Sequence, residues 1–153
     1  MRNIFVLNTL VLLIGLMLIN SSAFAQPPKT LNTKNGMQYM TGGIGEEEVA
    51  VMRSHAKQFT LNLLFSEGTS GRSVTDANVN IYDEASNLVF RIVGAKPMLY
   101  VNLPAGTYTI LANNAGQKLR HKITIEDNVN QRIILNWKDS LIEEDMPLDG
   151  EGN

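Results

Sequence analysis

The chain has 153 residues, enough for about one domain, with 44% hydrophobic residues, 18% charged residues and a formal net charge of −2. This composition is typical of a folded globular protein, and its near-neutral charge argues against a nucleic-acid-binding protein. The absence of cysteine excludes disulfides, a lipid-bearing cysteine, a thiol nucleophile and zinc sites with cysteine ligands, and two histidines exclude a three-histidine metal site.

The first 25 residues have the pattern of a secretory signal peptide. Arg2 adds a positive charge near the amino terminus, residues 4–19 form an apolar run, and Ala23-Phe24-Ala25 is an A-x-A cleavage site. The apolar run is shorter than the stretch of about 20 residues that a membrane-spanning helix needs. We therefore expect cleavage after Ala25 and an exported protein with no membrane span. Export without cysteine is ordinary for a bacterial periplasmic protein, so we expect a periplasmic location.

Residues 26–45 are predicted to be a linker or extended segment. Within it, residues 37–44 (MQYMTGGI) are apolar but fit neither a strand pattern nor the helix that follows. Two interpretations stay open. In one, the stretch packs over the open end of its own domain and joins the helix to it. In the other, it contacts a partner such as another envelope protein, because Met and Tyr are common at adaptable contact surfaces. As an extended segment it could also add to a sheet edge, its own or a partner's. The candidate partner contacts are Met37, Tyr39, Met40 and Ile44.

Residues 46–57 are predicted to form one short helix. Glutamates occupy its first turn, where carboxylates favour the helix dipole, and Val49, Met52 and Ala56 share one face. The glycine-rich residues 42–45 precede this helix, and such a loop can hold phosphate. Here the glutamates stand at the anion position and no lysine follows the glycines, so we expect only a joint or a tight entry into the helix.

Between residues 58 and 137 the hydrophobic pattern has a period of two. Seven short segments, spaced by about ten residues and separated by turn-forming residues, alternate apolar and polar side chains. The pattern predicts an all-β fold, a seven-stranded antiparallel β-sandwich with one short N-terminal helix. The residues expected to face the sandwich interior are Phe59, Leu61, Val79, Ile81, Phe90, Leu99, Val101, Tyr108, Ile110, Ile123, Leu135 and Trp137.

Residues 138–153 hold six acidic residues against one lysine. We expect a solvated acidic tail, and the alternative is an interaction tail that contacts a larger envelope assembly.

The two histidines are the candidates for metal chemistry. His55 lies on the predicted helix and His121 on a predicted strand, in the inward phase with Leu119 and Ile123. We expect each to be a partly buried, hydrogen-bonded histidine. Two histidines and a carboxylate could bind a transition metal, but no spacing predicts that these two meet. No nucleophile–base combination is visible, so we expect no enzyme, no catalytic residues and no cofactor, with a histidine-dependent metal-binding protein or enzyme as the alternative.

Residues 101–125, VNLPAGTYTILANNAGQKLRHKITI, resemble the C-terminal half of carboxypeptidase regulatory-like domains. The matching residues are Leu103, Pro104, Gly106, Tyr108, Gly116, Ile123 and Ile125. Residues 77–90 resemble the first hairpin of the same family, and the whole arrangement is similar to its small bacterial periplasmic members. The resemblance implies a transthyretin-like or Ig-like β-sandwich but no activity, because such domains have many roles. We therefore expect a non-catalytic, exported binding or interaction module of the cell envelope, whose ligand and oligomeric state the sequence does not name.

Overall fold

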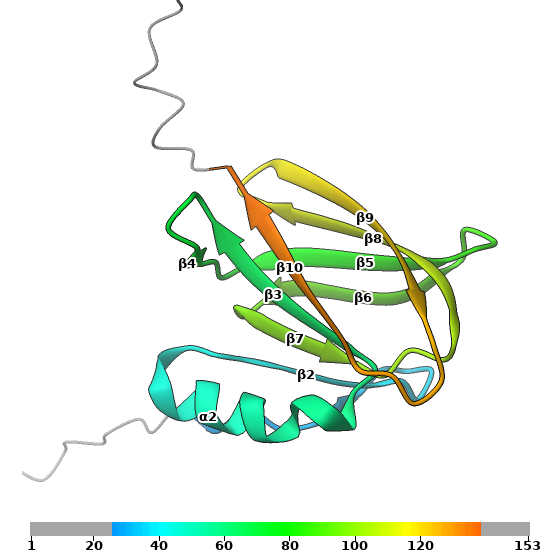
Figure 1. Ribbon diagram of the computed structural model, residues 1–153, viewed down its shortest axis with the longest axis horizontal. Helices are drawn as coiled ribbons and strands as arrows, with labels where there is room; N and C mark the ends of the chain where they lie inside the picture. The colour runs from blue at the N-terminus through cyan, green and yellow to red at the C-terminus, as the bar shows by residue number, and fades with distance from the viewer. Residues whose placement is uncertain (1–25, 139–153) are drawn as a thin grey trace, which may run out of the picture.

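The computed structural model describes residues 26–138, which form a helix and two β-sheets stacked in layers (Figure 1). The expected signal peptide and the expected acidic tail from residue 139 onward lie outside these residues. Sheet A contains, in spatial order, β1 (Leu31–Asn32), β2 (Gln38–Gly42), β7 (Met98–Val101), β3 (Leu61–Glu67) and β10 (Gln131–Trp137), with β4 (Arg72–Ser73) paired to β3. Sheet B contains, in spatial order, β6 (Leu88–Ala95), β5 (Ala77–Asp83), β8 (Gly106–Asn114) and β9 (Gln117–Ile125).

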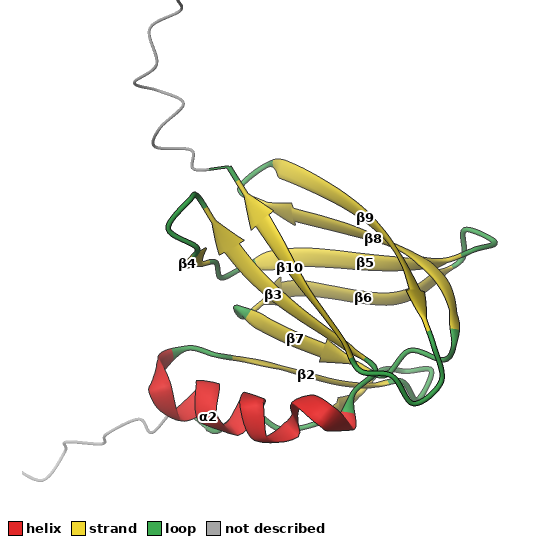
Figure 2. Ribbon diagram, in the orientation of Figure 1, coloured by secondary structure: helices red, strands yellow, loops and turns green. Residues whose placement is uncertain are grey.

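One helix covers part of the outer face of sheet A, as Figure 2 shows. It is α2 (Gly45–His55), continued by a short 3₁₀ turn, η1 (Ala56–Gln58). An all-β sandwich with one short helix is thus confirmed. Within the described residues the seven expected strands correspond to β3 and β5–β10, and the structure adds β1, β2 and β4 to them.

The expectation of a wholly antiparallel sandwich is wrong for one pair of strands. β10 runs parallel to β3, in a register that pairs Gln131 with Leu61 and Trp137 with Glu67. Because no turn joins these two strands directly, their hydrophobic patterns contain no information on their relative direction. Within the expected linker or extended segment, residues 38–42 form β2, which pairs antiparallel with β7.

Two apolar cores hold the layers together. The first lies between the two sheets and contains the predicted interior residues with one exception, Phe59. The second lies between helix α2 and the outer face of sheet A. Its buried members are Met40, Met52, Phe59, Met98 and Tyr100, with Val49, Val51, Ala56 and Leu64 packed against them.

Phe59 belongs to the second core because it precedes β3, which begins only at Leu61, so the alternation of that strand does not extend to it. Its ring lies 5.8 Å from that of Tyr100, measured between ring centroids. The same core explains why all four residues of β7 are buried. Leu99 faces the sandwich and Met98 faces the helix, so this strand reads as a continuous apolar run.

The segment that resembles carboxypeptidase regulatory-like domains includes the loop between β7 and β8. Leu103 is buried in the core between the sheets, and Pro104 lies in the exposed loop that follows. The Tyr108 hydroxyl donates a hydrogen bond to the Pro104 carbonyl oxygen at 2.8 Å. A tyrosine that bonds back to the chain a few residues upstream is a device also found in Ig-type sandwiches, where it ties a loop to the strand that follows.

Candidate functional site

The outer face of sheet B, opposite the sandwich core, is lined by polar and basic side chains. Successive residues of a strand point to opposite faces, so the burial of Val79, Ile81 and Ile110 places their neighbours outside. The outward residues of β5, β8 and β9 that line two hollows form what we call the basic face. They are Asn78, Asn80, Tyr82, Thr107, Thr109, Leu111, Asn113, Lys118, Arg120 and Lys122.

The strand register arranges most of these residues in three rows, each of which ends in a cation on the edge strand β9. The rows are Asn78–Asn113–Lys118, Asn80–Leu111–Arg120 and Tyr82–Thr109–Lys122. Neighbours within a row are about 5 Å apart, and successive rows are about 6.6 Å apart. The three cations therefore extend over about 13 Å along β9, each with a hydrogen-bonding side chain on the same row.

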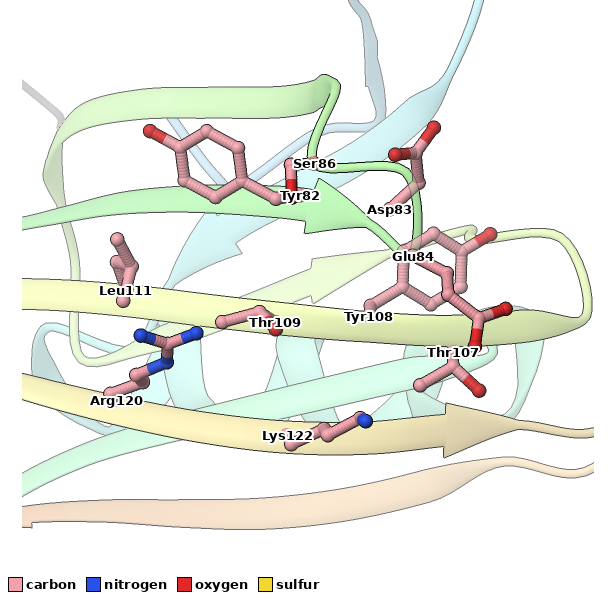
Figure 3. Close-up of a pocket in the computed structure, with 10 residues that line it drawn as sticks. All are labelled: Tyr82, Asp83, Glu84, Ser86, Thr107, Tyr108, Thr109, Leu111, Arg120 and Lys122. Carbon is pink, nitrogen blue, oxygen red and sulfur yellow. The ribbon is translucent and has the colours of Figure 1, made fainter.

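Two shallow hollows occupy the basic face and share Leu111 and Arg120. One has a volume of about 370 Å³ and lies toward Asn78, Asn113 and Lys118. The other has a volume of about 400 Å³ and lies toward the turn between β5 and β6. Figure 3 shows the second hollow, with Leu111 and Arg120 on neighbouring strands. The shared residues make the two hollows one continuous surface.

The second hollow has a negative end at Asp83 and Glu84. Asp83 accepts hydrogen bonds from the side-chain amide of Asn87 at 3.0 Å and from its backbone N–H at 2.7 Å. These two bonds lower the pKa of Asp83 below its ordinary value, so the carboxylate is charged at neutral pH. The second hollow is therefore positive along β9 and negative at this turn.

Tyr108 lies at the same end of the hollow, with its hydroxyl bonded to Pro104. Burial, and to a smaller extent the charge of Asp83, raises the pKa of Tyr108. The phenol thus stays protonated at neutral pH and keeps its hydrogen bond to the loop.

Of the four residues expected to contact a partner, the structure buries one, partly buries two and exposes one. Met37 and Tyr39 pack against the core between the sheets, and the Tyr39 ring meets Phe90 edge-on with centroids 5.4 Å apart. Met40 is fully buried under helix α2. Ile44, by contrast, is 52% exposed at the start of the helix. This stretch thus contributes a strand of its own sheet, between β1 and β7, and Ile44 is the most exposed of the four residues.

The two histidines lie in different layers. In His55, Nδ1 is 2.9 Å from the carbonyl oxygen of Val51 near the end of α2. His121 is exposed, and the expectation of partial burial is wrong for it because β9 is the edge strand of sheet B. Among residues 26–138, no group of three or more His, Cys, Asp or Glu side chains could hold a metal ion.

The anion position before helix α2 is occupied by the protein itself. Glu48 accepts hydrogen bonds from the backbone N–H groups of Gly43 at 3.1 Å and Ile44 at 3.0 Å. Its other oxygen accepts from Lys96 Nζ at 2.8 Å. Burial raises the pKa of Glu48, but the hydrogen bonds and charge of Lys96 and the two N–H groups outweigh it and lower the pKa overall. The glycine-rich loop therefore seats a carboxylate of its own chain.

The alternation of Lys118, Arg120 and Lys122 was the signal of the basic face in the sequence, where it indicated only a strand with one solvent-exposed side.

In the part of the chain that the structure describes, no helix has the length and apolar character needed to cross a membrane. Neither models of known protein families nor curated proteins match this chain, so no family is assigned to it.

Proposed function

We propose that the protein is an exported, non-catalytic binding module of the bacterial cell envelope, and that the basic face of sheet B is its ligand surface. The fold proposed for it is a transthyretin-like or Ig-like sandwich of the carboxypeptidase regulatory-like type. The sequence pattern LPAGTY and the bond from Tyr108 to Pro104 support this fold. The two-layered β-sandwich with strand β10 beside β3 is compatible with it.

The observation that carries the function is the set of three rows ending in Lys118, Arg120 and Lys122. Cations repeated at about 6.6 Å suit a ligand with repeated negative charges, because each can form a charge-assisted hydrogen bond. The asparagine, threonine and tyrosine side chains in the same rows as the cations can form hydrogen bonds with the hydroxyl groups of a sugar. The hollows are shallow and open, which favours an extended polymer over an enclosed small molecule. The ligand class is thus an acidic polysaccharide.

Calorimetric titration with dextran sulfate tests this proposal, with neutral dextran as the comparison ligand. The triple variant Lys118→Gln, Arg120→Gln and Lys122→Gln should lose at least tenfold in affinity. The matched control neutralises three exposed lysines away from the face, Lys29, Lys34 and Lys57, and should change the affinity by less than threefold. Equal losses in the two triple variants would refute the site. Tighter binding of an oligodeoxynucleotide of equal charge would refute the ligand class.

Export is tested separately by the mass of the protein recovered from the periplasm of an expressing bacterium. We expect a chain that begins at Gln26, as itself or as pyroglutamate. A chain that retains residues 1–25 and sediments with membranes would overturn the proposed location.

A further inference from the structure

The acidic residues that follow the described part of the chain have the opposite charge to the basic face. Residues 139–153 contain six acidic residues and no lysine or arginine, and three of the six are consecutive, Glu143, Glu144 and Asp145. The basic face presents Lys118, Arg120 and Lys122 along strand β9. Such a pair of charge patterns favours contact between the two segments.

The chain leaves the sandwich at the end of β10, beside the first residue of β9. The indole Nε1 of Trp137, the last residue of β10, donates a hydrogen bond to the carbonyl oxygen of Gln117 at 3.0 Å. Gln117 begins β9 and directly precedes Lys118. Figure 1 shows the end of β10 and the start of β9 at the same end of the sandwich. The described chain therefore ends close to the start of β9, the strand that contains Lys118, Arg120 and Lys122.

The connection from Trp137 to Glu143 is long enough for the three consecutive acidic residues to reach the cations along β9. Glu143 is six positions after Trp137, and an extended chain of that length spans about 20 Å. The three cations extend over about 13 Å along β9. Because β9 is the edge strand of sheet B, the path from the end of β10 to the outer face passes around one strand only.

Both the basic face and the acidic segment also contain apolar residues. Leu111 lies beside Arg120 in the middle row and is 37% exposed. In the acidic segment, Leu141 and Ile142 immediately precede the three acidic residues. Contact with Leu111 would remove apolar surface of either residue from water while the carboxylates meet the cations.

We propose that residues 139–153 dock on the basic face and compete there with the external anionic ligand, so that the protein contains its own competitor. This inference rests on the proposed function for the identity of the competing ligand. The docking itself does not depend on it, because it concerns two segments of one chain. An intramolecular competitor acts at the effective concentration set by its short connection, which is in the millimolar range for short links.

The test compares two double variants of the protein spanning residues 26–153, each of which removes two negative charges. One is Glu143→Gln with Glu144→Gln, and the matched control is Glu46→Gln with Glu47→Gln, two exposed glutamates on helix α2. The first should bind dextran sulfate about threefold to tenfold tighter than the unchanged protein. The control should gain less than twofold in affinity. The difference between the two variants should vanish at about 0.5 M salt, which screens exposed charges.

A second measurement requires no ligand. In nitrogen-15 spectra, the backbone amide signals of Lys118, Arg120 and Lys122 should shift between the unchanged protein and the Glu143/Glu144 variant. They should not shift in the Glu46/Glu47 control. Unshifted signals in the first variant would overturn the docking. If dextran sulfate binds none of the proteins but these signals shift, the proposed ligand class fails and the docking stands.

Discussion

Replacement of Glu48 by glutamine tests how helix α2 is attached to the sandwich. The side chain of Glu48 is 10% exposed and joins three groups, the N–H of Gly43, the N–H of Ile44 and the ammonium of Lys96. Glutamine has nearly the same shape and keeps one oxygen for the two N–H groups. It removes the negative charge, and its NH₂ group would face the ammonium of Lys96 as one donor against another.

The expected loss in the free energy of unfolding is about 2 kcal/mol. Hydrogen bonds to a charged group contribute about 1.5–3 kcal/mol each, and removing one partner of a fully buried ion pair costs about 3–5 kcal/mol. Lys96 is 37% exposed and can regain water when Glu48 is replaced, which places the loss near the lower end. The lost contacts lie within a small region, so the denaturant dependence of unfolding should not change.

Urea unfolding at pH 7, followed by tryptophan fluorescence, measures this loss. Glu47→Gln is the matched control, because Glu47 stands in the same helical turn, is exposed and should change the free energy of unfolding by less than about 0.5 kcal/mol. If the two variants lose the same amount, the attachment of the helix does not depend on the contacts of Glu48, and the reasoning fails.

The pH dependence gives a second check on Glu48. Its pKa is lowered in the folded protein from the ordinary value of 4.5, so the unfolded chain binds its proton at higher pH than the folded one does. The stabilisation by the ionised group is therefore complete above the ordinary carboxyl range and is lost as the pH falls through the folded-state pKa. The difference in stability between the unchanged protein and Glu48→Gln should shrink steadily below about pH 4.5.

Three further substitutions test the cores and the loops. Leu99→Ala removes a fully buried side chain from the core between the sheets and should cost about 2–5 kcal/mol in urea unfolding, and a loss near zero would mean that Leu99 does not face that core. Tyr108→Phe removes the bond to Pro104 and should cost about 0.5–1.5 kcal/mol, with no loss expected if the loop is held by other contacts. Gly42→Ala would place a Cβ atom 2.5 Å from Cγ of Pro28, so its melting temperature should fall by several degrees, and an unchanged value would contradict the close approach.

Local patterns in the sequence were sufficient to predict seven of the strands, the helix and most buried positions. Leu61, Ile81 and Ile110 were assigned to the core from the alternation in their own segments alone, since a strand in a two-layered fold must bury one face. Met52 was likewise assigned to the inner face of the helix from its spacing. These features depend on residues a few positions apart, which is the range over which a hydrophobic pattern contains information.

Tertiary structure decided which strands lie side by side. β2 was not predicted because MQYMTGGI has no alternation, and it has none because Met40 lies beneath the helix while Tyr39 meets the sandwich core. The parallel pairing of β3 with β10 joins residues 70 positions apart, from Leu61 to Gln131. Neither pairing has a local signal, since each depends on partner strands distant in the sequence.

The candidate site shows the same division. The sequence placed Lys118, Arg120 and Lys122 on one side of a strand, because side chains on a strand alternate with a period of two. Only the register of β5, β8 and β9 aligned them with Asn78, Asn80 and Tyr82 and formed a continuous face. The contact of Glu48 with Lys96, 48 positions away, likewise arises only when the helix packs on sheet A. A ligand surface is made of such distant neighbours, so the strands that compose it follow from the sequence while its shape follows from their packing.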